Sequence, residues 1–330
     1  MRIMSVEPDF NHKEAMTAII ILNWNGADDT LMCLDSLSRA EGMFFAVIVD
    51  NGSTDDSVSR LKEYISSSSM DITLLEMNAN LGFARGNNKG VAYAAKRNPD
   101  NYLLLNNDTE LTTDFLVKLV DFQSSNPEFH ILTPRINFYY NKNRIWNCGG
   151  ILRFGFRKYL FAGCDERKAL KKSHYPISFV TGCALFFMPD VLNADGSLFT
   201  ERFFFGEEDF DFSIRMKRSY KKMACVTDSL VYHKVGAANA KNNIPGKIYL
   251  HLLNRYIDIR IHYGKMFVLM WRIVNNPFSF HHLWREYGSA GQALSKLRRL
   301  EKESRNKNEV TEQDFRKLVI IGDYFDETDI

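Results

Sequence analysis

Four short apolar runs in the first third of the chain predict buried strands. They are "MTAIIIL" (16–22), "FFAVIVD" (44–50), "ITLLEM" (72–77) and "YLLLN" (102–106). Each is rich in β-branched or large apolar residues and has almost no polar position, which is typical of strands covered on both faces of a sheet.

The segments between these runs show helical spacing instead. Leu31, Leu34 and Leu37 share one face of a helix predicted over 28–40, and a second predicted helix covers 86–97. Ser53 followed by Asp56 resembles a capping box that opens the helix after the second strand, and a fourth helix is predicted after Thr112. The repeated order of strand, helix and strand predicts an α/β fold with a parallel, doubly wound sheet.

Polar clusters follow three of the predicted strands. They are "NWNG" (23–26), "DNGSTDD" (50–56) and "NND" (106–108). Any one of them is also explained as an ordinary turn, since Asn and Gly tolerate positive φ. Because open parallel sheets bind ligands at the carboxyl ends of their strands, we expect the three clusters to meet at one edge.

No standard phosphate-binding loop accompanies this edge. The glycines of "NANLGFARGNNKG" (78–90) do not form G-x-G-x-x-G, and the chain contains no G-x-x-x-x-G-K-[ST]. A bound nucleotide would therefore have its phosphates neutralised by a divalent cation, Mn²⁺ or Mg²⁺, held on Asp108, together with Arg85. Close packing of a helix on the sheet also explains Gly86 and Gly90.

Composition indicates a soluble globular protein of 330 residues, with 45% hydrophobic and 25% charged residues. We find no segment typical of a membrane span or a signal peptide. Five cysteines without a C-x-x-C pair indicate neither a disulfide framework nor a zinc site, so a cytoplasmic location is expected.

Charge divides the chain unevenly although the net charge is only +2. Residues 231–308 hold 14 Lys or Arg and 4 Asp or Glu, a local balance of +10 that leaves −8 for the rest. Two regions with different electrostatic roles are therefore expected.

Six motifs in order make the chain resemble family 2 glycosyltransferases, and most closely the rhamnosyltransferase-type branch that builds bacterial surface polysaccharides such as O-antigen and capsule. The motifs are "AIIILNWNGADDTLMCLDSL", "VIVDNGSTDDS", "NLGFARGNNKG", "LLLNNDTEL", "FVTGCALFF" and "ERFFFGEEDFDFSIR". The resemblance implies a GT-A fold, Rossmann-like with a mostly parallel sheet, over 16–235. It also implies transfer from a nucleoside-diphosphate sugar, such as a UDP- or dTDP-sugar, with inversion at the anomeric carbon.

The resemblance assigns the donor-binding residues to the half 16–110. Asn23 would lie beside the base, Asp50 would contact the nucleoside, and Arg85 would cover the nucleotide. "NND" stands where relatives carry D-x-D, so Asp108 would be the metal ligand and Asn106 replaces the first carboxylate. The other donor-binding residues in these motifs are Asn25, Asn51, Gly82 and Asn107.

The resemblance places the acceptor and the chemistry in the half 111–235. Asp209 would be the general base that takes the acceptor proton, with Glu208 as second choice, whereas Glu207 is explained as a helix-start carboxylate. His233 would join Asp108 at the metal, or be a hydrogen-bonded core residue. The sugar and acceptor side would include Trp146, Gly149, Thr181, Gly182 and Cys183, although tight packing also explains the glycines.

The remaining residues, 236–330, are expected to form a basic, mostly helical extension, and 1–15 a tail. We expect this extension to meet an anionic membrane surface, since acceptors in such pathways are commonly lipid-linked glycans. A charged face packed on the catalytic domain is the alternative, and no nucleic-acid motif is present.

Two other functions share the predicted sheet. A nucleotidyltransferase would usually carry a basic, Gly-rich loop early in the chain, and "NWNGADD" has no basic residue. A catalytically silent sugar-binding protein is supported by the departure from D-x-D.

Overall fold

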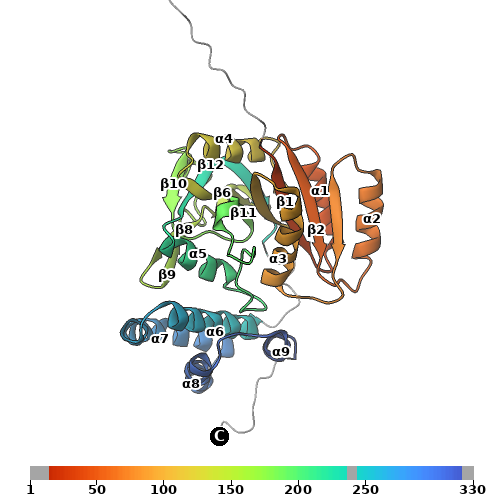
Figure 1. Cartoon of the computed structure of the whole chain (residues 1–330). Helices are drawn as coiled ribbons and strands as arrows, with labels where there is room; N and C mark the ends of the chain where they lie inside the picture. Colours follow the sequence, from red (N-terminus) through yellow and green to blue (C-terminus); the bar gives the residue numbers. More distant parts are fainter. Residues whose placement is uncertain (1–14, 236–243, 322–330) are drawn as a thin grey trace, which may run out of the picture.

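The computed structural model describes residues 15–235 and 244–321, so the expected tail lies outside the described residues except for Ala15. An α/β body lies above a layer of C-terminal helices (Figure 1). The predicted strands are present as β1 (Thr17–Asn23), β2 (Phe44–Asp50), β3 (Ile72–Glu76) and β4 (Asn101–Asn106).

These four strands form the parallel half of the sheet, in the order β4, β1, β2, β3. The helices between and after them are α1 (Ala27–Leu37), α2 (Ser57–Ser67), α3 (Phe83–Ala94) and α4 (Phe115–Ser125). Asn23 pairs in register with Asp50, so the carboxyl ends of β1 and β2 meet at one edge as predicted.

The second half of the same sheet is mixed. β11 (Ala184–Phe187) joins the halves and runs antiparallel to both β4 and β6 (Phe129–Phe138), whereas β6 and β12 (Lys222–His233) are parallel. β5 (Thr109–Leu111), β7 (Asn141–Asn147) and β10 (His174–Ile177) pair with its members, and β8 (Gly150–Arg153) forms a separate hairpin with β9 (Phe156–Tyr159).

Two predicted helix starts were wrong. α3 begins at Phe83 rather than 86, and α2 begins at Ser57 without a side-chain cap from Asp56. The hydroxyl of Ser53, which we assigned to a capping box, instead donates to Asp50 Oδ1 at 2.6 Å. A hydrogen bond to a buried carboxylate is stronger than one between neutral groups. The Ser53 hydroxyl therefore bonds to Asp50 at the end of β2 and does not cap α2.

The sheet is covered on both faces, as the apolar runs predicted. Ile20 of β1 packs in the core under α3, whereas its neighbours Ile19 and Ile21 pack in the core under α1 and α4. A side chain at Gly90 would come within 2.4 Å of Ile20, and one at Gly86 within 2.5 Å of Leu22. Both glycines therefore allow α3 to lie close on the sheet.

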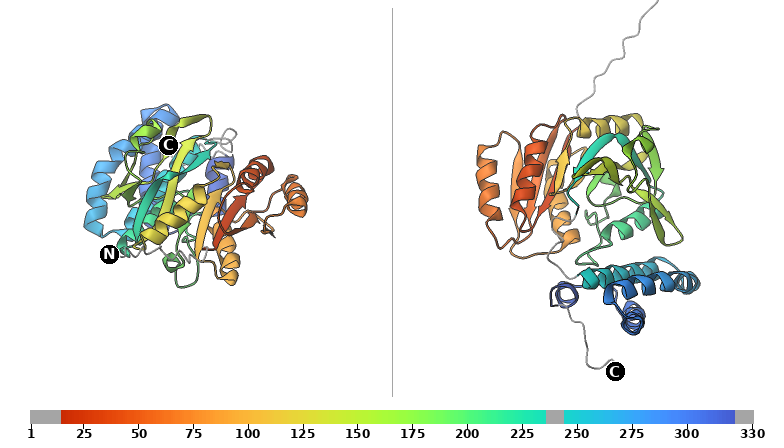
Figure 2. Two further views of the ribbon diagram at one scale, coloured as in Figure 1. Left: turned by 90° about the horizontal axis from the view of Figure 1, so that it is seen from above. Right: turned by 180° about the vertical axis from the view of Figure 1, so that it is seen from behind.

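The expected helical extension is present as α6 (Ile244–His262), α7 (Lys265–Tyr287), α8 (Ala290–Asn306) and α9 (Glu312–Phe315). Figure 2 shows this layer on one side of the α/β body. α5 (Glu208–Arg218) lies between them, since Phe212 packs in the core of the sheet and Phe210 in the core of the helical layer. In the described ranges, no helix is both long and apolar enough to cross a bilayer.

Candidate active site

The ends of β1 and β2 form a closed hydrogen-bond network around Asp50, which is 1% exposed. Its carboxylate accepts from Asn23 Nδ2 at 2.8 Å, from the Ser53 amide at 3.0 Å and from the Ser53 hydroxyl. Asn23 Oδ1 in turn accepts from Thr30 Oγ1 at 2.7 Å. The structure thus brings Asn23 and Asp50 together, and both side chains form hydrogen bonds within the protein.

Asn25 and Asn51 hold the loops that follow these strands. Asn25 Oδ1 accepts from the amide of Thr54 at 2.8 Å, and its own φ is +49°. Asn51 accepts from the amide of Leu81 at 3.0 Å and donates to the carbonyl of Gly82. Asn25 and Asn51, which we predicted to bind the sugar donor, therefore hold the loops at this edge of the sheet.

Gly82 and Arg85 begin α3 on the other side of this edge. Gly82 has φ +82°, and a side chain there would lie 2.2 Å from the carbonyl oxygen of Phe204. Arg85 pairs with Glu201 at 3.1 Å and lines a hollow of about 200 Å³. Among the described residues, no ion pair joins Arg85 to Asp108, so the two proposed phosphate-neutralising groups are not adjacent.

The structure brings Asp108 and His233 together, with 3.0 Å between Asp108 Oδ1 and His233 Nε2. The cause is the pairing of β5 with the end of β12, which sets His233 opposite Thr109. The amide of Lys234 also donates to the carbonyl of Asp108 at 2.9 Å. A turn after β4 and the end of β12, far apart in sequence, therefore converge.

This pair fits a cation site. The contact is short but lacks hydrogen-bond geometry, so within the described residues the buried Asp108 Oδ1 has no hydrogen-bond partner, and neither does His233 Nδ1. Burial lowers the pKa of His233, but Cys183 and Asp108 outweigh that effect and raise the pKa to about 10. Without a cation the imidazole is therefore protonated and balances the charge of Asp108, and a metal ion would have to displace that proton. A carboxylate and an imidazole are ligand types that Mn²⁺ accepts.

Asn106 and Asn107 support this turn in different ways. The amide of Asn106 donates to the carbonyl of Cys183 at 2.8 Å, and its own carbonyl accepts from Thr109 Oγ1. Asn107 Nδ2 donates to Thr30 Oγ1 at 3.0 Å. The turn that presents Asp108 is thereby fixed to β11 and to α1.

Two residues of the expected sugar side also lie at this pair. The ring of Trp146 packs edge-on against His233 at 4.4 Å between centroids, and Cys183 precedes β11 beside the same imidazole. Thr181 Oγ1 accepts from the amide of Cys183 at 3.4 Å. Trp146 and Cys183 therefore border the Asp108 and His233 pair, and Thr181 holds the backbone of Cys183.

The two glycines expected on the sugar side are explained by packing. A side chain at Gly182 would come within 3.0 Å of the ring of Phe83. Gly149 has φ +69°, and a side chain there would come within 2.4 Å of Ile177.

The first turn of α5 presents Glu208 and Asp209 with unequal surroundings. Glu208 is 6% exposed, its Oε1 accepts from the amide of Gly206 at 2.7 Å, and burial raises its pKa to about 8. Asp209 keeps 23% of its side chain exposed, and burial raises its pKa to about 6, partly offset by Arg157 at 3.9 Å. Asp209 is the more accessible of the two carboxylates.

Glu207 stands at the start of α5, as expected of a helix-start carboxylate, but it is also part of a buried ion-pair cluster. It has φ +72°, is 4% exposed, and pairs with Arg157 at 3.3 Å and with Arg255 of α6. Burial raises its pKa, but these two cations outweigh burial and hold the pKa well below its usual range. No local pattern indicates this cluster, because Arg157 and Arg255 are each about 50 residues from Glu207 in the chain.

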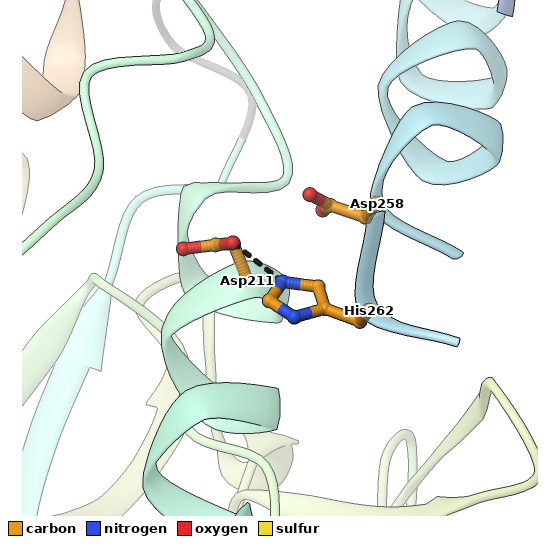
Figure 3. Close-up of side chains that lie close together, drawn as sticks. All are labelled: Asp211, Asp258 and His262. Carbon is orange, nitrogen blue, oxygen red and sulfur yellow. Dashed lines mark hydrogen bonds and ion pairs between the residues drawn. The ribbon is translucent and has the colours of Figure 1, made fainter. Parts of the chain in front are cut away.

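A second group of ionisable side chains joins α5 to α6 (Figure 3). His262 Nε2 lies 2.7 Å from Asp211 Oδ1, and Asp258 is close by on α6. Arg202 Nη1 lies 2.9 Å from Asp211 and 3.4 Å from Asp258, which is the position that a bound cation would take. We therefore interpret this group as a link between the α/β body and the helical layer.

Comparison with known proteins identifies the family and the fold of the chain. The model of the family described as glycosyl transferase family 2 matches residues 18–194. The chain is 26% identical over 278 residues to the low-salt glycan biosynthesis hexosyltransferase Agl10 of Haloferax volcanii. This alignment covers 79% of this chain and 84% of Agl10.

Solved structures share the fold at low sequence identity. The mannosyltransferase PcManGT from Pyrobaculum calidifontis, in complex with GDP-Man and Mn²⁺, is similar at 13% identity and TM-score 0.54, over 89% of this chain and 76% of that one. S. aureus TarS is similar at 14% identity and TM-score 0.51 over 81% of this chain, which spans 43% of the length of TarS. The chain therefore belongs to glycosyl transferase family 2, and it is a glycosyltransferase with a GT-A fold.

Proposed function

We propose that the enzyme transfers a sugar from a nucleoside-diphosphate donor to a hydroxyl of a glycan or lipid-linked glycan, with inversion, and that a divalent cation bound at Asp108 and His233 assists. The observation that carries this proposal is the buried Asp108 Oδ1, which lacks a donor and lies 3.0 Å from His233 Nε2. A bound cation would neutralise the charge on the diphosphate leaving group. The Mn²⁺ and GDP-Man bound to PcManGT support this proposal.

The residues of the chain have separate tasks in this reaction. Asn51 and Gly82 shape the loop beside the nucleotide, and Asp50 fixes the strand ends that would receive the nucleoside. Trp146 packs against His233 and limits the orientation of the imidazole. These groups bind and orient, so their loss should affect donor affinity.

Asp209 would act as the general base. An inverting transfer is an in-line displacement in which the acceptor hydroxyl becomes nucleophilic as its proton leaves. A carboxyl with a pKa of about 6 is ionised at neutral pH and more basic than an ordinary Asp. Glu208, with a pKa of about 8, is mostly protonated there and its Oε1 is occupied by the Gly206 amide.

Two donor sugars are favoured by different similarities. The resemblance to rhamnosyltransferases favours dTDP-rhamnose and a role in bacterial surface polysaccharide, such as O-antigen, whereas the similarity to Agl10 favours a hexose. We expect location on the cytoplasmic side, at the inner membrane surface where lipid-linked acceptors would be met.

A donor-hydrolysis and transfer assay tests the proposal. Purified enzyme is incubated with dTDP-rhamnose, UDP-glucose, UDP-galactose and GDP-mannose, with Mn²⁺, with Mg²⁺ or with chelator. We expect nucleoside diphosphate release from one donor, and its loss in chelator. Release that is equal with and without chelator would contradict the cation role, and no release from any donor would contradict the proposed donor class.

A further inference from the structure

The outer face of α7 is apolar although it is exposed. Met266, Ile273 and Phe278 are 74%, 63% and 61% exposed. Leu269, Met270 and Val274 lie between them at helical spacing and are also more than half exposed, and Trp284 follows at 47%. We define these seven residues as the outer face of α7. Soluble proteins rarely expose so continuous an apolar stripe without a partner.

The inner face of α7 combines apolar packing with a polar patch, since Trp271 and Leu283 are buried in the core of the helical layer. Asn275 Nδ2 donates to the Ser279 hydroxyl at 2.9 Å, and Asn276 Nδ2 donates to Glu301 of α8 at 2.8 Å. The hydroxyl of Tyr256, on α6, donates to Asn276 Oδ1 at 2.7 Å. A surface helix in water normally has one apolar side and one polar side, whereas α7 is apolar on its exposed side as well as on the side that packs inward. α7 is therefore built to meet an apolar medium with its outer face.

Most charges near this face are positive. Lys265 begins α7 and is exposed, and Arg285 in its last turn has 71% of its side chain exposed, although it pairs with Glu286 at 3.3 Å. On the neighbouring α8, Arg298, Lys302 and Arg305 line an open hollow together with one acidic residue, Glu301, which also accepts from Asn276 of α7. The outer face itself carries no acidic residue. A second copy of the chain would bring the same cations together, whereas an anionic surface complements them.

We propose that α7 docks flat on an anionic lipid bilayer. Its outer face enters the boundary between headgroups and acyl chains, and Lys265, Arg285 and the basic side chains of α8 contact lipid phosphates. The hydrogen bonds of the inner face keep α7 attached to α6 and α8. This docking does not depend on sugar transfer, so it stands or falls separately from the proposed function.

Vesicle sedimentation with the full chain tests the proposal. We compare phosphatidylcholine vesicles with vesicles that also contain phosphatidylglycerol, at low and high salt. The double variant Met266→Gln/Met270→Gln removes apolar surface without changing charge. Met43→Gln is the matched control, because Met43 is 42% exposed ahead of β2. We expect the wild type and Met43→Gln to bind phosphatidylglycerol vesicles, and each methionine of the double variant to cost on the order of tenfold in partitioning.

Two further measurements separate the alternatives. Fluorescence of Trp284 should shift to shorter wavelength with vesicles, and Trp284→Phe should remove most of that shift. Nucleotide affinity of the double variant should equal that of the wild type, which shows that it is folded. Equal vesicle binding by the double variant and the wild type, no preference for anionic vesicles, or a dimer that the double variant abolishes would each overturn the proposal.

Discussion

The ends of β1 and β2 and the ends of β4 and β12 carry similar polar residues and use them differently. Asp50, after β2, accepts three hydrogen bonds from Asn23 and Ser53. Asp108, after β4, has a buried oxygen without a donor in the described chain, 3.0 Å from His233. Since an unsatisfied buried acceptor is costly, the first region reads as scaffold and the second as a binding site.

The acidic cluster at the start of α5 repeats this difference over three residues. Glu207 pairs with two arginines and is held ionised, whereas Asp209 is partly exposed and, among the described residues, pairs with Arg157 alone, at 3.9 Å. The lesson is that the carboxylates with the fewest internal partners are the candidates for chemistry. Each prediction below tests whether that distinction holds.

The largest effect is expected at Asp209. Asp209→Asn keeps size and polarity and removes proton acceptance, so the transfer rate should fall by roughly 10² to 10⁴-fold. Donor affinity should be unchanged, because the base acts on the acceptor. Steady-state kinetics and calorimetry measure the two quantities. Glu208→Gln is the control, and a near wild-type rate for Asp209→Asn with a dead Glu208→Gln would move the base to Glu208.

A smaller loss is expected at Asp108. Asp108→Ala removes a proposed cation ligand, so the tightening of nucleoside diphosphate binding by Mn²⁺ should fall on the order of 10 to 100-fold. Isothermal titration with and without Mn²⁺ measures it. Thermal stability should change little, because this carboxylate has few internal bonds, and a large fall in stability would assign Asp108 to the scaffold.

Asp50 should show the opposite behaviour. Asp50→Asn replaces an acceptor by an amide that faces the donors of Asn23 and Ser53, so we expect a loss of about 1–3 kcal/mol in the free energy of unfolding. Urea denaturation measures this loss. Unchanged stability would show that the closed network does not hold the strand ends.

The pH profile gives the smallest but most specific distinction. If Asp209 is the base, it must be ionised, so the rate should rise with pH through a midpoint near its pKa of about 6 and then level. Below that midpoint the rate should fall about tenfold per pH unit. A midpoint near 8 would match the pKa of Glu208 instead and contradict the assignment.

Local patterns in the sequence predicted the parallel half of the sheet well. The run 16–22 became β1 at Thr17–Asn23, and 44–50 became β2 unchanged, because a strand buried on both faces admits almost no polar residue. The proximity of Asp108 to His233 came from the family resemblance alone. Nothing in the local pattern links two residues that meet only through the pairing of β5 and β12.

Other features depend on partners far along the chain. Glu207 meets Arg157 and Arg255 only after β9 and α6 have packed beside it. The sequence predicted a basic, mostly helical extension over 236–330, but the residue spacing within 265–287 does not say which face of α7 is inward. That orientation follows from the burial of Trp271 and Leu283 and from the bonds of Asn276 to Tyr256 and Glu301.

Mn²⁺ binding followed by electron paramagnetic resonance, with nucleoside diphosphate present, tests the cation site most directly. The signal of free Mn²⁺ should fall when wild type or Asp209→Asn is added, because both keep Asp108 and His233. It should persist with Asp108→Ala and with His233→Ala. If Asp108→Ala immobilises Mn²⁺ as tightly as the wild type, the cation binds elsewhere and the contrast between the two strand-end regions has no functional meaning.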